Sequence, residues 1–254
     1  MKSLQIQPLL ETDAGSISRL IESGIKHNVF PLTIYSSPKY SEFVKKSMSN
    51  SVDVKFFGAY YENHLLGFTE WRITDNQLFL NNIATSKKAR GLGIGRKLYH
   101  HGLSSLERRS MICLALDVFD DNIFAKAWYE KMGFEQIDLT HWYTSPQNLI
   151  ERREGGNFHI TNFDQAKEHH GKYGFSVINI ATSIGEYGIG RINSSHFRIS
   201  DKCLLDTDLL VALKEIDEDR NLLLLSKQSS VDGFKKVSTS HRMRKGILHQ
   251  VGGI

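Results

Sequence analysis

Glycine, arginine and lysine gather between Arg90 and Lys97, where the chain reads RGLGIGRK. An apolar stretch from Leu78 to Ala84 comes before them, and a helical pattern starts at Arg96. The sequence therefore predicts a strand, a glycine-rich turn and a helix. Glycines let a backbone approach an anion closely, and the first turn of a helix offers unpaired N–H groups to it. We interpret this stretch as a phosphate-binding turn.

The glycine-rich turn has three other possible interpretations. Glycines are common in plain loops. A nucleoside triphosphate loop needs lysine and then serine or threonine after its last glycine, but Gly95 is followed by Arg96. A dinucleotide fingerprint needs a third glycine, and Leu98 stands at that position. The spacing that fits is Arg-x-x-Gly-x-Gly, formed by Arg90, Gly93 and Gly95.

A second group of polar residues follows about thirty residues downstream. Asp120 or Asp121 is expected to cap a helix that runs from Asn122 to Met132, and the dipeptide Gly133-Phe134 ends it. Asn122 and Tyr129 are seven residues apart, so they share one helical face. Tyr129 can also be interpreted as a core tyrosine with a satisfied hydroxyl.

Taken together, the two motifs resemble those of the GCN5-related N-acetyltransferase (GNAT) family, over residues 1–146. The resemblance implies an α/β (α+β) fold with a mixed, mostly antiparallel central sheet flanked by helices. It implies an acyltransferase that moves an acetyl group directly from acetyl-CoA to a primary amine. The acceptor could be a small molecule, such as an amino sugar, or a protein. A non-catalytic acetyl-CoA sensor or partner-recruiting module is the alternative function.

The resemblance also assigns roles to residues. Backbone amides of the glycine-rich turn would hold the coenzyme pyrophosphate, and the strand before the turn would pair with the pantetheine arm. Tyr129 would be the general acid that protonates the leaving thiolate. The implied coenzyme contacts are Ile83, Ala84, Thr85, Arg90, Gly91, Leu92, Gly93, Ile94, Gly95, Arg96, Asn122 and Tyr129.

The general base is the point at which this sequence departs from the family pattern. Family members often carry a carboxylate on the strand before the turn, but this strand has amides, Asn81 and Asn82. Glu70, Asp117 or water could accept the proton instead. Arg72 lies on the same strand face as Glu70, so an ordinary ion pair competes with a catalytic role for that carboxylate.

The elements expected around these motifs follow from periodicity. The expected strands are 4–7, 54–61, 65–73, 77–84, 111–118, 134–138 and 140–144. Four helices are expected: one after residue 13, one that begins at Ser37-Pro38, one over 96–109 and one over 122–132. The strands from 54 to 84 form an antiparallel meander that leads into the glycine-rich turn.

The remaining residues are expected to form a linker, 147–157, and a smaller strand-rich accessory domain, 158–254, whose role cannot be predicted. Its expected elements are a helix at 164–170, strands at 174–181 and 195–199, a hairpin of 209–216 with 221–226, and a mobile basic tail over the last twenty residues. Residues 188–191 repeat the tetrapeptide GIGR of 93–96. The segment that follows is strand-like and lacks the second motif, so we do not predict a tandem of two acetyltransferase units.

Composition limits the other classes of function. The net charge of +4 suits an anionic ligand and is too small to favour nucleic acid. No apolar run approaches a membrane span, and the first residues lack a signal-peptide core, so we expect a cytoplasmic protein. The histidines at 159, 169, 170 and 196 match no zinc spacing, and the two cysteines are expected to be buried thiols, so no metal is predicted. A homodimer is compatible with all of these features.

Overall fold

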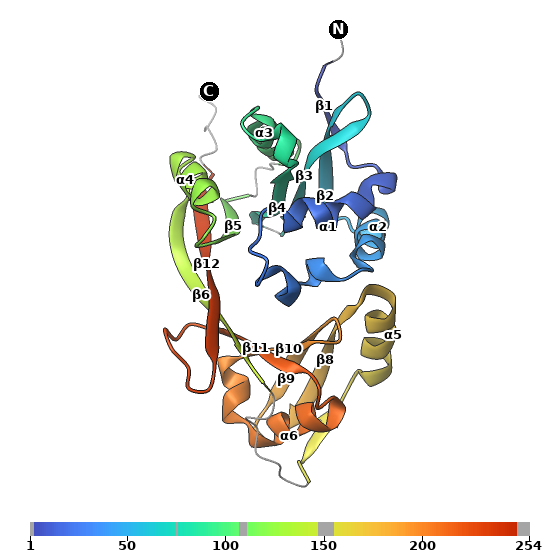
Figure 1. Cartoon of the computed structure of the whole chain (residues 1–254), viewed down its shortest axis with the longest axis vertical. Coiled ribbons are helices and arrows are strands. Elements are labelled where there is room, and N and C mark those ends of the chain that lie inside the picture. Colours follow the sequence, from blue (N-terminus) through green and yellow to red (C-terminus); the bar gives the residue numbers. More distant parts are fainter. Residues whose placement is uncertain (1–2, 75, 107–110, 147–154, 248–254) are drawn as a thin grey trace, which may run out of the picture. The chain divides into compact units, whose positions relative to one another are not determined.

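The computed structural model describes residues 3–74, 76–106, 111–146 and 155–247 (Figure 1). The chain divides into two compact units. Unit 1 comprises Met1–Lys26, Ser41–Asp138 and His241–Ile254, and unit 2 comprises His27–Tyr40 and Leu139–Ser240. These units differ from the expected segments 1–146 and 158–254, because residues 27–40 and the last strand each belong with a part of the chain that is distant in sequence.

Unit 1 is built around a mixed sheet in the strand order β1-β2-β3-β4-β5-β12-β6. Its elements are β1 (Gln5–Pro8), α1 (Ala14–Glu22), α2 (Tyr40–Asn50), β2 (Val54–Tyr61), β3 (His64–Ile73), β4 (Gln77–Thr85), α3 (Ile94–Leu106), β5 (Cys113–Phe119), α4 (Ile123–Lys131), the start of β6 (Glu135–Ser145) and the end of β12 (Lys235–Gly246). Strands β2, β3 and β4 pair antiparallel, whereas β4 and β5 pair parallel through α3. The predicted meander and crossover are confirmed.

Helix α3 packs closely on this sheet. Leu98 and Tyr99 on α3 are buried, and the fully buried indole of Trp71 on β3 lies against them. Gly102 faces the same indole, and a Cβ atom at this position would overlap it. The close approach of α3 to β3 therefore requires glycine at position 102.

Unit 2 contains a second sheet region in the strand order β12-β6-β11-β10-β9-β8-β7. Its remaining elements are β7 (Phe158–Ile160), α5 (Phe163–Tyr173), β8 (Phe175–Thr182), β9 (Glu186–Ile192), β10 (His196–Ser200), the 3-10 helix η6 (Asp201–Leu205), α6 (Thr207–Ile216) and β11 (Asn221–Ser226). A buried core forms around Phe197, Ile189 and Leu213. Strands β8, β9 and β10 are antiparallel, and β10 pairs parallel with β11.

Three expectations about the second half are corrected by the structure. Residues 209–216 lie in helix α6, not in a strand, because Asp206 caps that helix: its Oδ1 accepts a hydrogen bond from the N–H of Leu209 at 3.0 Å. Residues 235–246 form strand β12, not a mobile tail. The expected strands 134–138 and 140–144 are one strand, β6. Of the expected linker, 147–154 lie outside the described residues.

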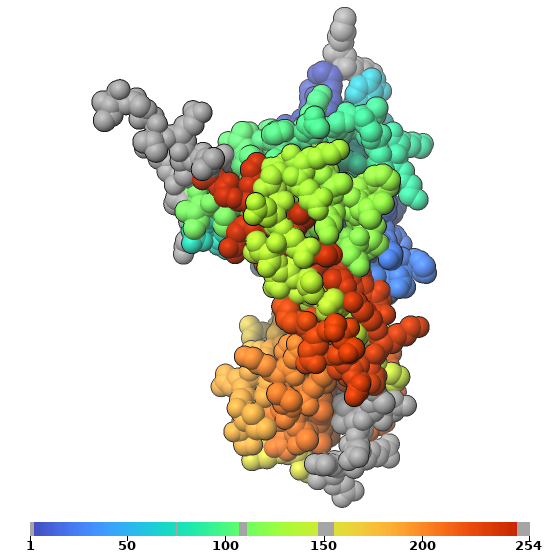
Figure 2. Space-filling view, turned by 90° about the vertical axis from the view of Figure 1, so that its left-hand side faces the viewer, coloured from blue at the N-terminus to red at the C-terminus, as the bar shows by residue number. Residues whose placement is uncertain are grey.

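Two basic side chains at the end of β12 have partners elsewhere in unit 1. Arg242 forms a two-pronged ion pair with Asp117 on β5, in which Nη2 lies 2.9 Å from Oδ2. Lys245 Nζ donates to the carbonyl of Met132 at 2.6 Å, after the end of α4. The space-filling view shows this end of β12 lying against α4 (Figure 2). These contacts explain why a basic, polar segment is ordered as a strand.

Candidate functional site

The glycine-rich turn lies where the sequence predicts it, between β4 and α3 in unit 1. Gly91 and Gly93 have φ angles of +78° and +73°, in the left-handed region that favours glycine. A Cβ atom at either position would meet nothing within 4 Å, so the requirement for glycine comes from the backbone angle and not from crowding. Helix α3 begins at Ile94, two residues before the expected start. Its first N–H groups therefore follow the turn directly.

Arginine and lysine side chains surround this turn in two different ways. Arg96 and Lys97 are exposed in the first turns of α3. In contrast, Arg90 Nη2 donates to the carbonyl of Ser23 at 2.8 Å and lies 3.0 Å from its hydroxyl. The Arg90 guanidinium thus ties the turn to the end of α1, and the predicted contact of Arg90 with the coenzyme stays a prediction.

Strands β4 and β5 separate beside the turn. Their parallel pairing runs from Gln77 opposite Cys113 to Leu80 opposite Leu116, although β4 continues to Thr85 and β5 to Phe119. No ladder pair joins residues 81–85 to the described end of β5. A register shift between β3 and β4 marks the same level, where Glu70 faces Asn82 and Trp71 faces Leu80. The backbone of Ile83, Ala84 and Thr85 therefore borders the opening into which an extended ligand arm could pair.

Asn122 and Tyr129 occupy opposite ends of α4. Asn122 is the N-cap: its side-chain oxygen accepts a hydrogen bond from the N–H of Ala125 at 3.2 Å. The Asn122 side chain is therefore already committed to the helix through its oxygen. Tyr129 is 5 % exposed, and its ring meets that of Phe134 edge-on at 5.8 Å. Burial, and secondarily the neighbouring Tyr99, raises the pKa of Tyr129 above its ordinary value, so its hydroxyl keeps its proton.

Both carboxylates considered as the general base are held in ion pairs. Glu70 is 1 % exposed; its Oε1 accepts from Arg72 Nη2 at 3.2 Å and its Oε2 accepts from the Asn82 amide at 2.7 Å. Asp117 is paired with Arg242 on β12. Both carboxylates thus already have arginine partners. The ion pair expected between Glu70 and Arg72 is confirmed.

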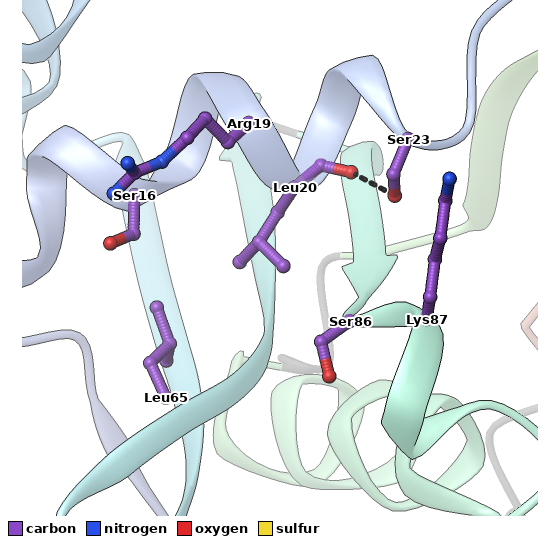
Figure 3. Close-up of a pocket in the computed structure, with 7 residues that line it drawn as sticks. All are labelled: Ser16, Arg19, Leu20, Ser23, Leu65, Ser86 and Lys87. Atoms are coloured by element: carbon purple, nitrogen blue, oxygen red, sulfur yellow. Dashed lines mark hydrogen bonds between the residues drawn. The ribbon is translucent and has the colours of Figure 1, made fainter.

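A pocket of about 310 Å³ opens beside the turn, between α1 and the ends of β3 and β4 (Figure 3). Three hydroxyls, two cationic side chains and two leucines line it: Ser16, Ser23, Ser86, Arg19, Lys87, Leu20 and Leu65. Ser86 and Lys87 directly follow Thr85, and Ser23 is the residue that Arg90 binds. The pocket therefore adjoins both the strand opening and the glycine-rich turn.

The site residues predicted from the sequence all lie in one unit, but the residues that line the pocket from α1 were not predicted. Residues 83–85, 90–96, 122 and 129 all lie in unit 1. Ser16, Leu20 and Ser23 line the pocket from α1, sixty residues or more before the turn. Their spacing of four and then three residues is a helical face, and this face is the signal that could have found them.

A strand, a glycine turn and a helix, beside two strands that separate, form the arrangement expected for binding acetyl-CoA. Residues 27–134 match the family model described as the acetyltransferase (GNAT) family. This segment, which is less than half of the chain, is thus similar to the GNAT family, whose members are N-acetyltransferases that use acetyl-CoA.

A relative in Salmonella typhimurium is the [ribosomal protein bS18]-alanine N-acetyltransferase. It is 29 % identical over 82 residues, which are 32 % of this chain and 55 % of that protein. The chain thus spans about half the length of this relative. The likeness supports the family, and the acceptor of that enzyme does not carry over directly.

Solved structures are similar over nearly the whole chain. A tandem GNAT protein from the clavulanic acid biosynthesis pathway aligns with a TM-score of 0.69 at 12 % identity, over 96 % of this chain and 98 % of that one. A GCN5-related N-acetyltransferase from Sphaerobacter thermophilus aligns with a TM-score of 0.63 at 11 % identity, over 96 % and 95 %. At these identities the likeness concerns the fold alone. It covers unit 2 as well as unit 1.

Unit 2 repeats the fold without repeating the site. Its order of strand, helix, antiparallel meander, helix and parallel strand follows that of unit 1. The tetrapeptide at 188–191 lies in strand β9, as its sequence indicated, so it is not the counterpart of the turn. The counterpart segment is 201–206, which contains no glycine and three acidic or sulfur-bearing residues, Asp201, Cys203 and Asp206. No helix separates β11 from β12 in the described segment 227–234, so the Asn122–Tyr129 motif has no counterpart.

Within the described residues, no group of three or more histidine, cysteine, aspartate or glutamate side chains is arranged to hold a metal ion. None of the helices in the described part of the chain is long and apolar enough to cross a membrane.

Proposed function

We propose that unit 1 binds acetyl-CoA and transfers its acetyl group to a primary amine. The observation that carries this proposal is the glycine turn, with Gly91 and Gly93 in the left-handed region, next to the unpaired edge of β4 at 81–85. In this proposal the amides at the start of α3 hold the pyrophosphate, with charge from Arg96 and Lys97. The backbone of 83–85 aligns the pantetheine arm and polarises the thioester carbonyl.

The reaction needs two proton movements. The acceptor nitrogen attacks the thioester carbon, a C–N bond forms and the C–S bond breaks. Tyr129, which burial keeps protonated, donates a hydrogen bond and then a proton to the leaving thiolate. The acceptor amine loses its proton to water, because Glu70 and Asp117 are already bonded to arginines.

The acceptor is a primary amine that also carries an anionic group. The pocket beside the turn supports this choice, because Arg19 and Lys87 line it and neither forms an ion pair with a described acidic residue. Small amino compounds and protein N-termini both fit this description. The likeness to an alanine N-acetyltransferase keeps a protein α-amine among the candidates.

A panel of acceptors tests the proposal. The full chain is incubated with acetyl-CoA and with amines that differ in their anionic groups, including a peptide with N-terminal alanine, and free thiol is measured. We expect thiol release that depends on the amine and an acetylated product of matching mass. If acetyl-CoA binds but no acceptor yields thiol, the enzyme interpretation fails.

That second outcome would favour a non-catalytic acetyl-CoA sensor. The observation behind this alternative is that both carboxylates near the opening are held in ion pairs, which leaves the described site without an uncommitted carboxylate base. Binding of acetyl-CoA without turnover separates the two functions.

A further inference from the structure

Unit 2 contains polar atoms that are buried together and have no partner. Ser176 on β8, Arg191 on β9 and His170 on α5 each contribute one: Oγ, Nε and Nδ1. Ser176 is only 5 % exposed. Buried polar atoms in native proteins are almost always hydrogen-bonded, to protein, water or an ion, so three orphans in one place need an explanation.

The sheet register brings these atoms together. Ser176 stands directly opposite Arg191, and Arg191 stands directly opposite Phe197 on β10. Residues opposed in this way point to the same face of a sheet, with Cβ atoms about 5 Å apart. The backbone of Asn193, two residues after Arg191, lies close enough to His170 to act on its pKa. All three orphan atoms therefore lie around the end of β9.

Positive charge is in excess at the same place. The guanidinium of Arg220, which is 3 % exposed, lies over the Phe197 ring, 5.3 Å from its centroid. Its Nε donates to Asp217 at 2.7 Å, and Nη1 donates to the carbonyl of His196 at 3.3 Å. Arg191 and Arg220 are close enough that each contributes to lowering the pKa of His170. Among the described residues, Asp217 is the acidic group that acts on Arg191, and it is also bonded to Arg220, so two guanidinium charges share this carboxylate.

We propose that His170, Ser176, Arg191 and Arg220 form a binding site for an oxyanion, a carboxylate or phosphate group, in unit 2. A hydroxyl, a guanidinium N–H and an imidazole N–H are donors that match such a group. A water molecule would satisfy hydrogen bonds but would not balance the charge. The site lies at the starts of β10 and β11, whereas the coenzyme opening of unit 1 lies at the far ends of β4 and β5. It is therefore not a remnant of a second coenzyme site.

Binding should take up a proton at His170. Burial, then Arg191 and Arg220, lower the pKa of His170 to about 4. The backbone of Asn193 acts in the opposite direction, and His169 adds a small lowering. At neutral pH the ring is thus uncharged, and an anion beside Nδ1 would raise its pKa. Since the protonated form binds more tightly, affinity rises as pH falls from neutrality toward 5. His196 faces Arg220 and also has a lowered pKa, so its resonance is followed separately.

Titration calorimetry of the full chain with inorganic phosphate and with acetate tests the proposal. It is run in two buffers of different ionisation enthalpy, so that proton uptake is measured, and histidine resonances are followed by NMR. We expect a binding event that takes up a proton and shifts the His170 resonance, which distinguishes it from phosphate held at the glycine turn of unit 1. A response to phosphate alone assigns a phosphate group, and a response to acetate alone assigns a carboxylate.

Variants locate the site. Arg191→Gln and Ser176→Ala should each weaken binding by about tenfold or more, because each removes a donor to a charged group. Arg198→Gln is the matched control. Arg198 is exposed on β10 and directly follows Phe197, so it lies on the opposite face of the sheet. This variant should bind the anion with an affinity within about twofold of wild type. Melting curves check folding, and Ser176→Ala is the variant retained if Arg191→Gln unfolds. The proposal is overturned if neither anion binds or moves the His170 resonance, or if both folded variants bind as the wild type does.

Discussion

Replacing Tyr129 by phenylalanine removes one hydroxyl and little else. The Tyr129 ring is 5 % exposed and packs against Trp128 and Phe134, with centroids 5.1 and 5.8 Å away. Phenylalanine preserves these ring contacts. A hydrogen bond to a charged group is worth about 1.5–3 kcal/mol, and a positioned general acid contributes about 10²–10⁴-fold. We therefore expect kcat to fall by roughly 10²-fold in Tyr129→Phe.

The assay separates chemistry from binding. Thiol release measures kcat, and calorimetry with acetyl-CoA measures its Kd, which should stay within about twofold of wild type because the hydroxyl acts on the leaving thiolate. Tyr99→Phe is the control, since Tyr99 belongs to the same aromatic cluster and its ring meets that of Phe134 at 6.5 Å. Its melting temperature should match that of Tyr129→Phe, and its kcat should stay near wild type.

The pH dependence supplies a second test of Tyr129. Burial raises its pKa above the ordinary 10.0, so its proton is retained at every lower pH. The ratio of wild-type to Tyr129→Phe turnover should therefore be constant between about pH 6 and pH 9. Equal turnover of the two proteins would refute the proton-donor role. Loss of acetyl-CoA binding together with turnover would assign Tyr129 to packing instead.

Three other outcomes are expected. Calorimetry or native mass spectrometry should find one acetyl-CoA per chain, because segment 201–206 of unit 2 lacks glycine; two equivalent sites would contradict this. Gly93→Ala places a side chain at φ +73°, which costs about 1–2 kcal/mol, so acetyl-CoA affinity or stability should drop. Gly15→Ala in α1, where a Cβ meets nothing within 4 Å, should leave the affinity unchanged and should not lower the stability. Asp206→Ala should lower the free energy of unfolding by about 1 kcal/mol through loss of the α6 cap. Burial raises the pKa of Asp206, but hydrogen bonds from Thr182 and the N–H of Leu209 outweigh burial, so the pKa is lowered in the folded state. The stabilisation by the Asp206 carboxylate is therefore present above the ordinary pKa of 3.8 and is lost as pH falls through the lower folded value. A stability difference between wild type and Asp206→Ala that persists at still lower pH would argue against a role of the carboxylate charge.

The first half of the fold could be predicted because its signals are local. The strand from Val54 to Tyr61 has the predicted bounds, and the strand after the turn at Glu62 differs by one residue at its start. Gly93 and Gly133, both with positive φ, mark a turn and a helix end that the sequence indicates directly. In these places propensity, periodicity and turn chemistry agree.

The predictions for the second half of the chain were wrong where a partner distant in the sequence decides the structure. The apolar run at 209–213 fits a strand or a buried helix equally well, and the cap at Asp206 favours the helix. The polar segment at 235–246 has no strand pattern, and it is ordered by neighbours such as Asp117 that are more than a hundred residues away. The order of elements that unit 2 shares with unit 1 was not predicted, because segment 201–206 of unit 2 contains no glycine to mark it. The residues that line the pocket from α1 were not predicted either, because they are distant in the sequence from the glycine turn.

The position of β12 bears on how the protein is made. Residues 241–246 belong to unit 1, and β12 stands between β5 and β6 in its strand order. The N–H of Ile247 also bonds to the carbonyl of Ile112, just before β5, at 3.0 Å. A nascent chain thus leaves the ribosome with the glycine turn complete but with the sheet beside it lacking a strand. Domains commonly fold in order as they emerge, from the N-terminus onward. Unit 1 is the first unit to be synthesised in part and the last to be completed. A fragment ending near residue 146 should therefore expose the unpaired edges of β5 and β6 to other chains.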